Sequence, residues 1–247
     1  IYLNMSFINK MSTTSTEMVF SKKALKYNSY DQIIDLPNIN QKQVDDYVLL
    51  GYKKSEFTYN VNDYRSLIFH KNKLIAYSPP KSLDFDHFKR LYPNFRKLYR
   101  EESTIEIEMF VEGTMIMVYY NKDLETWHTS TRGNIGANCS FFESKTKKTF
   151  RNMFDETCNI SFLDINSLNK DYCYIFVMNH PDNRIVSNCK IPELYLVKVY
   201  KIVNNEEDKT FEVFVLNNLD VLKDEFTSTL VKFPNTELNT KTIRNKL

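Results

Sequence analysis

Apolar and polar residues alternate most regularly between positions 105 and 111. Isoleucine, methionine and valine occupy every second position there, with two glutamates and Phe110 between them. Because successive side chains of a strand point to opposite faces, this alternation predicts a strand with one buried face. Gly113 interrupts the pattern. Two further strands are then predicted at residues 115–120 and 126–131, joined by a short polar turn.

Several other segments have the pattern of strands or helices. Strands are predicted at residues 65–77 (two strands around a turn), 172–178, 194–202 and 211–216. Helices are predicted at residues 40–51, 84–91 and 140–154. In the first of these helices, Asn40 is the expected N-cap and Gly51 the expected stop. The elements together indicate an α+β protein, with mostly antiparallel sheets and a few flanking helices.

Length and charge limit the possibilities for domains and partners. The chain has 247 residues, of which 42% are hydrophobic, enough to bury the core of one large domain or two small ones. Residues 1–20 are rich in Ser, Thr and Asn and are expected to be disordered, whereas residues 21–247 are expected to form a single domain. The 33 basic residues nearly balance the 31 acidic ones. Any basic surface for nucleic acid is therefore expected to be local.

The cysteines and the apolar runs predict the cellular environment. The four cysteines are Cys139, Cys158, Cys173 and Cys189. Because none belongs to a Cys-x-x-Cys pair, we expect free thiols in a reducing compartment and no zinc site. No cofactor is expected. No apolar run approaches the roughly 20 residues of a membrane span, so a cytoplasmic protein without a membrane partner is expected.

Motif-like sequences occur in order between residues 60 and 200. They read Arg-Ser-Leu-Ile-Phe at 65–69 with Ser-Pro-Pro-Lys-Ser at 78–82, Phe-Val-Glu-Gly-Thr at 110–114, Ser-Thr-Arg-Gly-Asn-Ile at 130–135, and Tyr-Ile-Phe-Val at 174–177 with Asn-Arg-Ile-Val at 183–186. In order and spacing they resemble the nucleotidyltransferase domain of the T4 RNA ligase 1-like family. That superfamily also includes mRNA capping enzymes and DNA ligases. The resemblance implies a ligase-like fold over residues 21–247.

The resemblance also implies roles for individual residues. In that family, the arginine that matches Arg65 and the lysine that matches Lys81 reach the nucleotide phosphates. Glu112 and Arg132 likewise match positions that contact the nucleotide. These side chains are chemically suited to the task, since guanidinium and ammonium groups bind phosphate and a carboxylate accepts hydrogen bonds from a base or ribose.

The sequence departs from the family pattern where catalysis takes place. Phe110 occupies the place of the lysine that carries AMP in the family, and a phenyl ring cannot form a phosphoramidate. Ile175 occupies the place of the glutamate that holds the ribose. After Val186, motifs IV and V are not recognisable, and we expect them to be lost or to lie outside this sequence. These departures predict a catalytically inactive member of the superfamily, a pseudoenzyme.

The remaining side chains suggest a binding pocket. The candidate ligand-binding residues are Phe110, Glu112, Arg65, Lys81, Arg132, Tyr174 and Phe176. An aromatic ring stacks on a base for about 1–3 kcal/mol, and the cations would hold phosphates. We therefore expect a nucleotide or an RNA 5′ end, including the mRNA cap, as the ligand.

Two alternatives belong to other functional classes. The first is an active RNA ligase or capping-type nucleotidyltransferase, with a relocated nucleophile or with a second chain that supplies the missing motifs. The second is a scaffold or interaction protein that keeps only the fold. The other proteins of a translation or capping complex are candidate partners in either non-catalytic case. The composition, rich in Asn, Lys, Ile, Tyr and Phe, is similar to that of proteins of large DNA viruses, which suggests the host cytoplasm or a viral factory.

Overall fold

The chain divides into two units in the computed structural model. The structure describes residues 3–7, 18–56, 58–82, 86, 89–90, 93, 105–109, 111–141, 148–183 and 189–234. One unit comprises Met18–Lys81 and Glu112–Lys232. The other comprises Ile1–Glu17, Ser82–Val111 and Phe233–Leu247.

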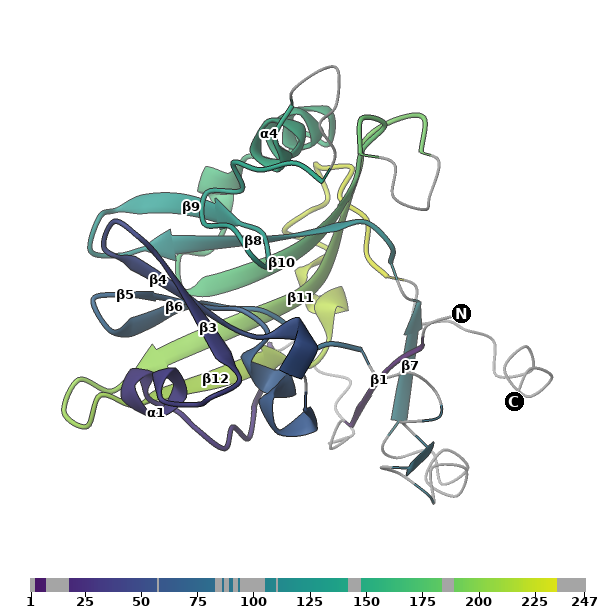
Figure 1. The fold of residues 1–247 in the computed structure, drawn as a ribbon. Helices are drawn as coiled ribbons and strands as arrows, with labels where there is room; N and C mark the ends of the chain where they lie inside the picture. The colour runs from purple at the N-terminus through teal and green to yellow at the C-terminus, as the bar shows by residue number, and fades with distance from the viewer. Residues whose placement is uncertain are drawn as a thin grey trace. The chain divides into compact units, whose positions relative to one another are not determined.

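The larger unit contains two antiparallel sheets (Figure 1). The four-stranded sheet has the order β3 (Ile39–Val44), β4 (Tyr47–Tyr52), β5 (Leu67–His70) and β6 (Lys73–Tyr77). The six-stranded sheet has the order β2 (Phe20–Lys22), β12 (Phe211–Leu216), β11 (Glu193–Asn204), β10 (Tyr172–Asn179), β8 (Thr114–Asn121) and β9 (Thr126–Ser130). Side chains from both sheets, such as Leu50, Ile68, Met117 and Ile175, form one buried cluster. The two sheets therefore share a core between them.

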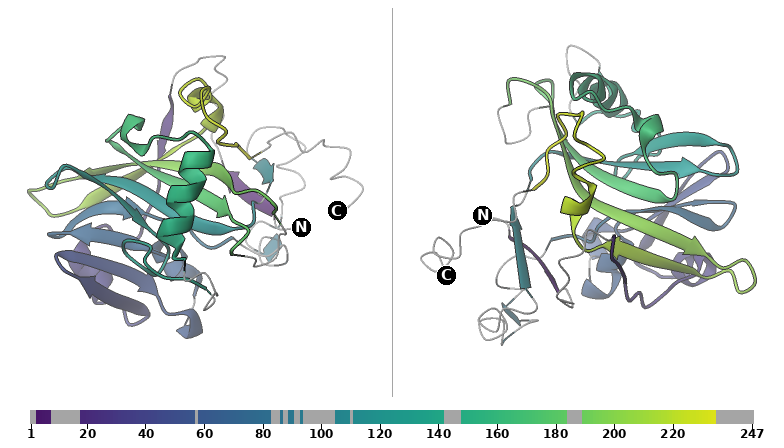
Figure 2. Two further views of the ribbon diagram at one scale, coloured as in Figure 1. Left: turned by 90° about the horizontal axis from the view of Figure 1, so that it is seen from above. Right: turned by 180° about the vertical axis from the view of Figure 1, so that it is seen from behind.

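The helices of this unit are few and short. The α-helices are α1 (Tyr30–Ile34) and α4 (Phe150–Ile160), and the 3-10 helices are η1 (Lys54–Glu56), η2 (Tyr59–Tyr64), η3 (Ile165–Ser167) and η4 (Leu219–Leu222). Figure 2 shows α4 across the outer face of the six-stranded sheet, where Phe154 packs on Phe176 of β10 with ring centroids 6.1 Å apart. Each face of that sheet therefore has its own apolar layer.

The ends of α4 are fixed by local hydrogen bonds. Thr149 and Asn152 form a capping box at its start. At its end, the amide of Leu163 donates to the carbonyl of Cys158 at 2.9 Å, and the amide of Phe162 donates to that of Asn159 at 3.2 Å. These two hydrogen bonds form a Schellman motif, in which Phe162 adopts the left-handed conformation with φ 55°.

The smaller unit contains one pair of described strands. Strand β1 (Leu3–Phe7) pairs antiparallel with β7 (Ile105–Met109), with Met5 opposite Ile107. Strand β1 therefore lies within the first 20 residues, where disorder was expected. The formation of one domain by residues 21–247 stays a prediction.

The predicted class is confirmed, since the structure is α+β with antiparallel sheets and few helices. The hairpin at residues 65–77 and the strands near 115–120, 126–131, 172–178, 194–202 and 211–216 are also confirmed. The cysteines Cys139, Cys158, Cys173 and Cys189 are free thiols. No helix in the described part of the chain is long and apolar enough to cross a membrane.

The helix predicted at residues 40–51 is wrong, because this segment forms the β3–β4 hairpin. Asp45 has φ 52°, which suits the tight turn of a hairpin. Strand β4 is buried at five of its six positions, so burial against the other sheet outweighed the helix-like spacing of the apolar residues.

The helix predicted at residues 140–154 was placed too early. It begins at Phe150, after the Thr149 cap, and continues to Ile160. Residues 142–147, and most of the helix predicted at 84–91, lie outside the described residues.

Candidate functional site

Arg132 lies beside the ring of Tyr52, and both residues act electrostatically on Arg65. The guanidinium carbon of Arg132 is 5.9 Å from the centroid of the Tyr52 ring. Burial lowers the pKa of Arg65, and the nearby charge of Arg132 lowers it as well, whereas Tyr52 acts in the opposite direction. Arg65 and Arg132 are 67 positions apart in the sequence, since 132 − 65 = 67, yet the fold brings them together. We call Arg65, Arg132 and Tyr52 the arginine site.

The close approach of two strands positions Arg65. Tyr52 ends β4, and Arg65 precedes β5, which pairs antiparallel with β4. A Cβ atom on Gly51 would lie 2.9 Å from the carbonyl oxygen of Arg65, closer than side chains tolerate. Glycine at position 51 therefore allows the backbone of Arg65 to reach its place.

A compact loop after β9 positions Arg132. The amide of Thr131 donates to the carbonyl of Asn134 at 2.9 Å, and the amide of Gly136 donates to that of Thr129 at 2.9 Å. Gly136 has φ 83°, a conformation that glycine adopts without strain. These bonds fold residues 131–136 back on themselves, with Arg132 near the turn.

Buried polar atoms on the segments of the arginine site lack partners. The Nε atom of Arg65, the Oγ atom of Ser66 and the Oδ1 atom of Asn134 are buried and make no hydrogen bond within the described part of the chain. No acidic side chain among the described residues forms an ion pair with Arg65 or Arg132. A buried donor or acceptor without a partner costs about 1–3 kcal/mol, so a ligand that satisfied these atoms would gain that energy.

Two other predicted residues occupy segments of this unit. Lys81 is exposed, and its backbone is held by Asn62, whose side chain accepts from the Lys81 amide at 2.8 Å and donates to the Lys81 carbonyl at 3.1 Å. Glu112 is half-buried and lies two residues before the first residue of β8. Gly113 follows it with φ 151°. Phe110 lies outside the described residues.

Tyr174 and Phe176 are placed differently from the expectation. Both side chains are fully buried, and their rings stack with centroids 6.3 Å apart on the α4 side of β10. The hydroxyl of Tyr174 accepts from the amide of Asn169 at 3.0 Å. Ile175, on the opposite face of the strand, belongs with Tyr52 to the cluster between the sheets. Tyr174 and Phe176 therefore form part of the packing beneath α4 and do not join the arginine site.

Tyr52 was not among the predicted site residues. Its sequence neighbourhood gave no signal, because Gly51-Tyr52 was interpreted as the end of a helix. Asn134 and Ser66 lie inside the motif-like sequences at 130–135 and 65–69 but were not predicted as site residues. Their positions in the sequence could have suggested a role in the site, since Ser66 directly follows Arg65 and Asn134 lies two residues after Arg132.

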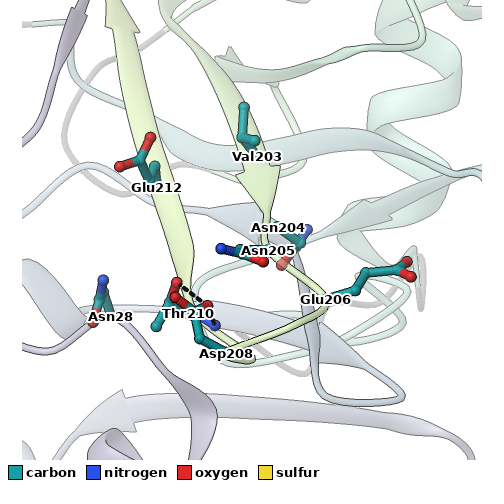
Figure 3. A pocket seen from close by; sticks show the side chains of 8 residues that line it. All are labelled: Asn28, Val203, Asn204, Asn205, Glu206, Asp208, Thr210 and Glu212. Carbon is teal, nitrogen blue, oxygen red and sulfur yellow. Dashed lines mark hydrogen bonds between the residues drawn. The ribbon is translucent and has the colours of Figure 1, made fainter.

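A pocket of about 600 Å³ lies elsewhere, around the turn between β11 and β12 (Figure 3). Its lining consists of Asn28, Val203, Asn204, Asn205, Glu206, Asp208, Thr210 and Glu212. Glu206 pairs with Lys73 at 2.7 Å, and Asp208 accepts from the hydroxyl of Thr210 at 2.6 Å. The pocket is acidic and contains none of the predicted site residues, so it is unsuited to phosphate.

Part of the chain is similar to a known ligase. A protein from Rhodothermus phage RM378, named RNA ligase, is 34% identical to it over 110 residues. The match covers 42% of this chain and 24% of the phage protein, so this chain matches about a quarter of the length of that relative. No family model matches the chain. No solved structure matches it either. The similarity indicates a ligase-like relationship and no more.

Proposed function

We propose that this protein is a nucleotidyltransferase-like domain that binds a nucleotide or an RNA 5′ end at the arginine site without transferring it. The observation that supports this most directly is the proximity of Arg65 and Arg132 without an acidic partner among the described residues. Two cations held together in a partly buried place repel each other. A phosphate group would remove that repulsion and accept bidentate hydrogen bonds from guanidinium groups.

The absence of catalysis in this proposal follows from side-chain chemistry. Phe110 has no atom that can attack a phosphate, so a covalent nucleotide adduct cannot form there. Ile175 is fully buried and purely hydrocarbon, so it cannot hold a ribose hydroxyl by a hydrogen bond. The similarity to an RNA ligase supports the type of ligand, and these two positions argue against the reaction.

Binding and labelling experiments test the proposal together. Calorimetry would compare ATP, GTP, a methylated cap analogue and a 5′-phosphorylated oligoribonucleotide, with the same oligonucleotide bearing a 5′-hydroxyl as the matched control. We expect binding that requires the phosphate, and no protein-bound radioactivity after incubation with α-labelled ATP or GTP. A labelled protein would favour the active enzyme, and no binding by any of these ligands would favour the scaffold.

A further inference from the structure

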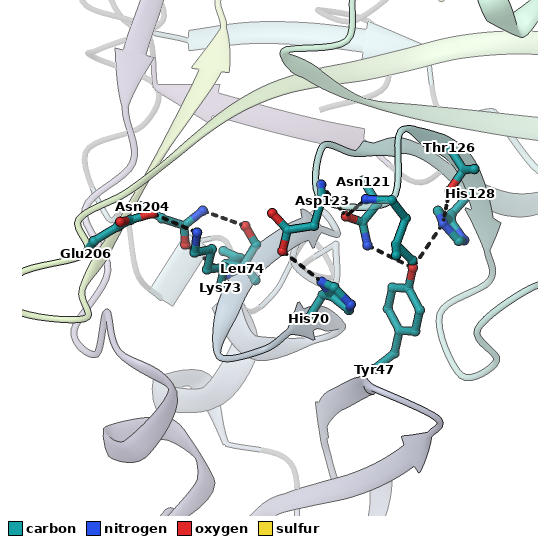
Figure 4. A network of polar contacts seen from close by, with 11 residues as sticks. Tyr47, His70, Lys73, Leu74, Asn121, Asp123, Thr126, His128, Asn204 and Glu206 are labelled. Carbon is teal, nitrogen blue, oxygen red and sulfur yellow. Dashed lines mark hydrogen bonds and ion pairs between the residues drawn. The ribbon is translucent and has the colours of Figure 1, made fainter.

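A network of polar side chains joins the two sheets at the Tyr47 end of β4 (Figure 4). Tyr47 is the first residue of β4 and Tyr52 the last, so the two are separated by five residue steps, roughly 17 Å of extended strand. On the other sheet, His128 lies within β9, whereas Arg132 follows the far end of that strand. The arginine site and the network therefore use opposite ends of β4 and different positions along β9 and the loop after it.

Asn121 fixes the direction of the hydrogen bonds in this network. Its Oδ1 atom accepts from the amides of Asp123 at 3.0 Å and Leu124 at 3.3 Å, so its amide nitrogen faces the other way. That nitrogen donates to the hydroxyl of Tyr47 at 2.8 Å. The hydroxyl hydrogen of Tyr47 must then point to another acceptor, because one of its lone pairs is already occupied.

The acceptor in reach is the Nε2 atom of His128, 3.0 Å from the Tyr47 hydroxyl. For this bond, Nε2 must be free of hydrogen and the neutral ring must carry its proton on Nδ1. The hydroxyl of Thr126 is 2.9 Å from the same nitrogen. A protonated ring would carry a hydrogen on Nε2 and could donate it to Thr126, which would leave the Tyr47 hydroxyl without its acceptor.

The charged groups around His128 oppose its protonation more than they favour it. The groups that face it or its contacts are Tyr47 and Asp46 on the β3–β4 hairpin, His70 on β5, Tyr119 on β8, Asp123 on the β8–β9 turn and Arg151 on α4. Burial lowers the pKa of His128, and His70 and Arg151 lower it too. Asp123 lies 3.4 Å from His70 Nδ1.

We propose that His128 is a proton-sensitive latch between the two sheets. The neutral imidazole accepts from Tyr47 and ties β9 to β4, and one added proton on Nε2 removes the acceptor of the Tyr47 hydroxyl hydrogen. Acidification then loosens this end of the unit without unfolding it. The inference does not depend on nucleotide binding, because none of the latch residues belongs to the arginine site.

The single tryptophan of the chain, Trp127, is next to His128 and reports on this end directly. We expect its fluorescence to change between pH 7.5 and 5 while the far-ultraviolet circular dichroism stays constant. His128→Gln keeps an acceptor in place of Nε2 and removes the proton site, so the change should disappear. His180→Gln, at another buried histidine, is the matched control and should retain it. A change of equal size and midpoint in His128→Gln would overturn the proposal.

Nuclear magnetic resonance provides a second test that needs no variant. Long-range proton–nitrogen spectra of the histidine rings distinguish the two neutral forms. At pH 7.5 we expect His128 to carry its proton on Nδ1, and a ring protonated on Nε2 would refute the latch. Tyr47→Phe removes only the hydroxyl and should give the acid-state fluorescence at both pH values, whereas a pH response like that of the wild type would contradict the proposal.

Discussion

A Cβ atom added to Gly51 would lie 2.9 Å from the carbonyl oxygen of Arg65. The contact involves backbone on both sides, so neither strand can give way by a simple side-chain rotation. Strand β4 and the segment before β5 approach closely here, and this approach brings Arg65 towards Tyr52 and Arg132. A single missing methyl group therefore influences the geometry of the arginine site.

Gly51→Ala should lower both stability and ligand affinity. Overpacking of this kind costs about 1–3 kcal/mol, and the relief of the clash would displace Arg65. Denaturant unfolding and calorimetry with a 5′-phosphorylated oligoribonucleotide measure the two effects. Gly133→Ala is the matched control, because a Cβ there meets nothing within 4 Å. Equal effects of the two variants would show that the approach at Gly51 is unimportant.

Arg65→Gln should separate binding from stability. The substitution removes a partly buried charge that has no acidic partner among the described residues, so the free energy of unfolding should stay the same or increase. Loss of charge-assisted bonds to phosphate should weaken ligand binding by about 10- to 100-fold. Thermal unfolding without ligand and calorimetry with ligand give the two values. A strong loss of stability would instead indicate that Arg65 is a structural residue.

Gly113→Ala should be strongly destabilising. Gly113 has φ 151°, and a Cβ there would lie 2.6 Å from the carbonyl oxygen of Met178 and 2.8 Å from a methyl carbon of Val177. The strain and the clash together are expected to cost about 2 kcal/mol or more. Chemical denaturation measures the change. A loss below about 0.5 kcal/mol, the usual range for surface sites, would contradict the close packing of β8 and β10 at this point.

Stability should decrease as the pH falls below the ordinary histidine range. Burial lowers the pKa of His180 from 6.5, although Glu156 and Asp182 act in the opposite direction. The unfolded chain therefore takes up this proton more readily than the folded one. The contribution of neutral His180 is complete above pH 6.5 and is lost as the pH falls through the lowered pKa. Melting temperatures from pH 8 to 5 should fall less in His180→Gln than in the wild type.

Phe162→Gly should stabilise the protein. Phe162 is 69% exposed and has φ 55° at the position after the α4 cap, where glycine is the favoured residue. Glycine would relieve roughly 1 kcal/mol of left-handed strain, and little buried surface would be lost. Phe162→Ala, which keeps a Cβ, is the control and should bring no gain. A decrease in the melting temperature of Phe162→Gly would show that the exposed ring contributes packing.

A strand whose burial is continuous could be predicted from the sequence. Residues 172–178 were found because an apolar run of strand length follows a polar turn. The β3–β4 hairpin was missed because β3 is exposed at every position after Ile39 and so lacks alternation. Asn40 and Gly51 then resembled helix caps, although tertiary contacts give them other roles.

The arginine site could be predicted in part. Arg65 and Arg132 were identified from the motifs, and Tyr52 was not, since only the fold brings it close. The face of β10 on which Tyr174 and Phe176 lie could have been predicted from the two-residue period of a strand. If Ile175 occupies the place of a ligand-binding glutamate, its two neighbours must point to the other face.

The exposed edge of the four-stranded sheet also affects how copies of this protein meet. Strand β3 lies at the end of that sheet, and its outer edge offers backbone amides and carbonyls to any extended chain. Lys42 is the only charged residue in the strand, at its fourth position. A charged side chain on an edge strand opposes edge-to-edge pairing, so we expect Lys42 to disfavour the association of two copies through β3.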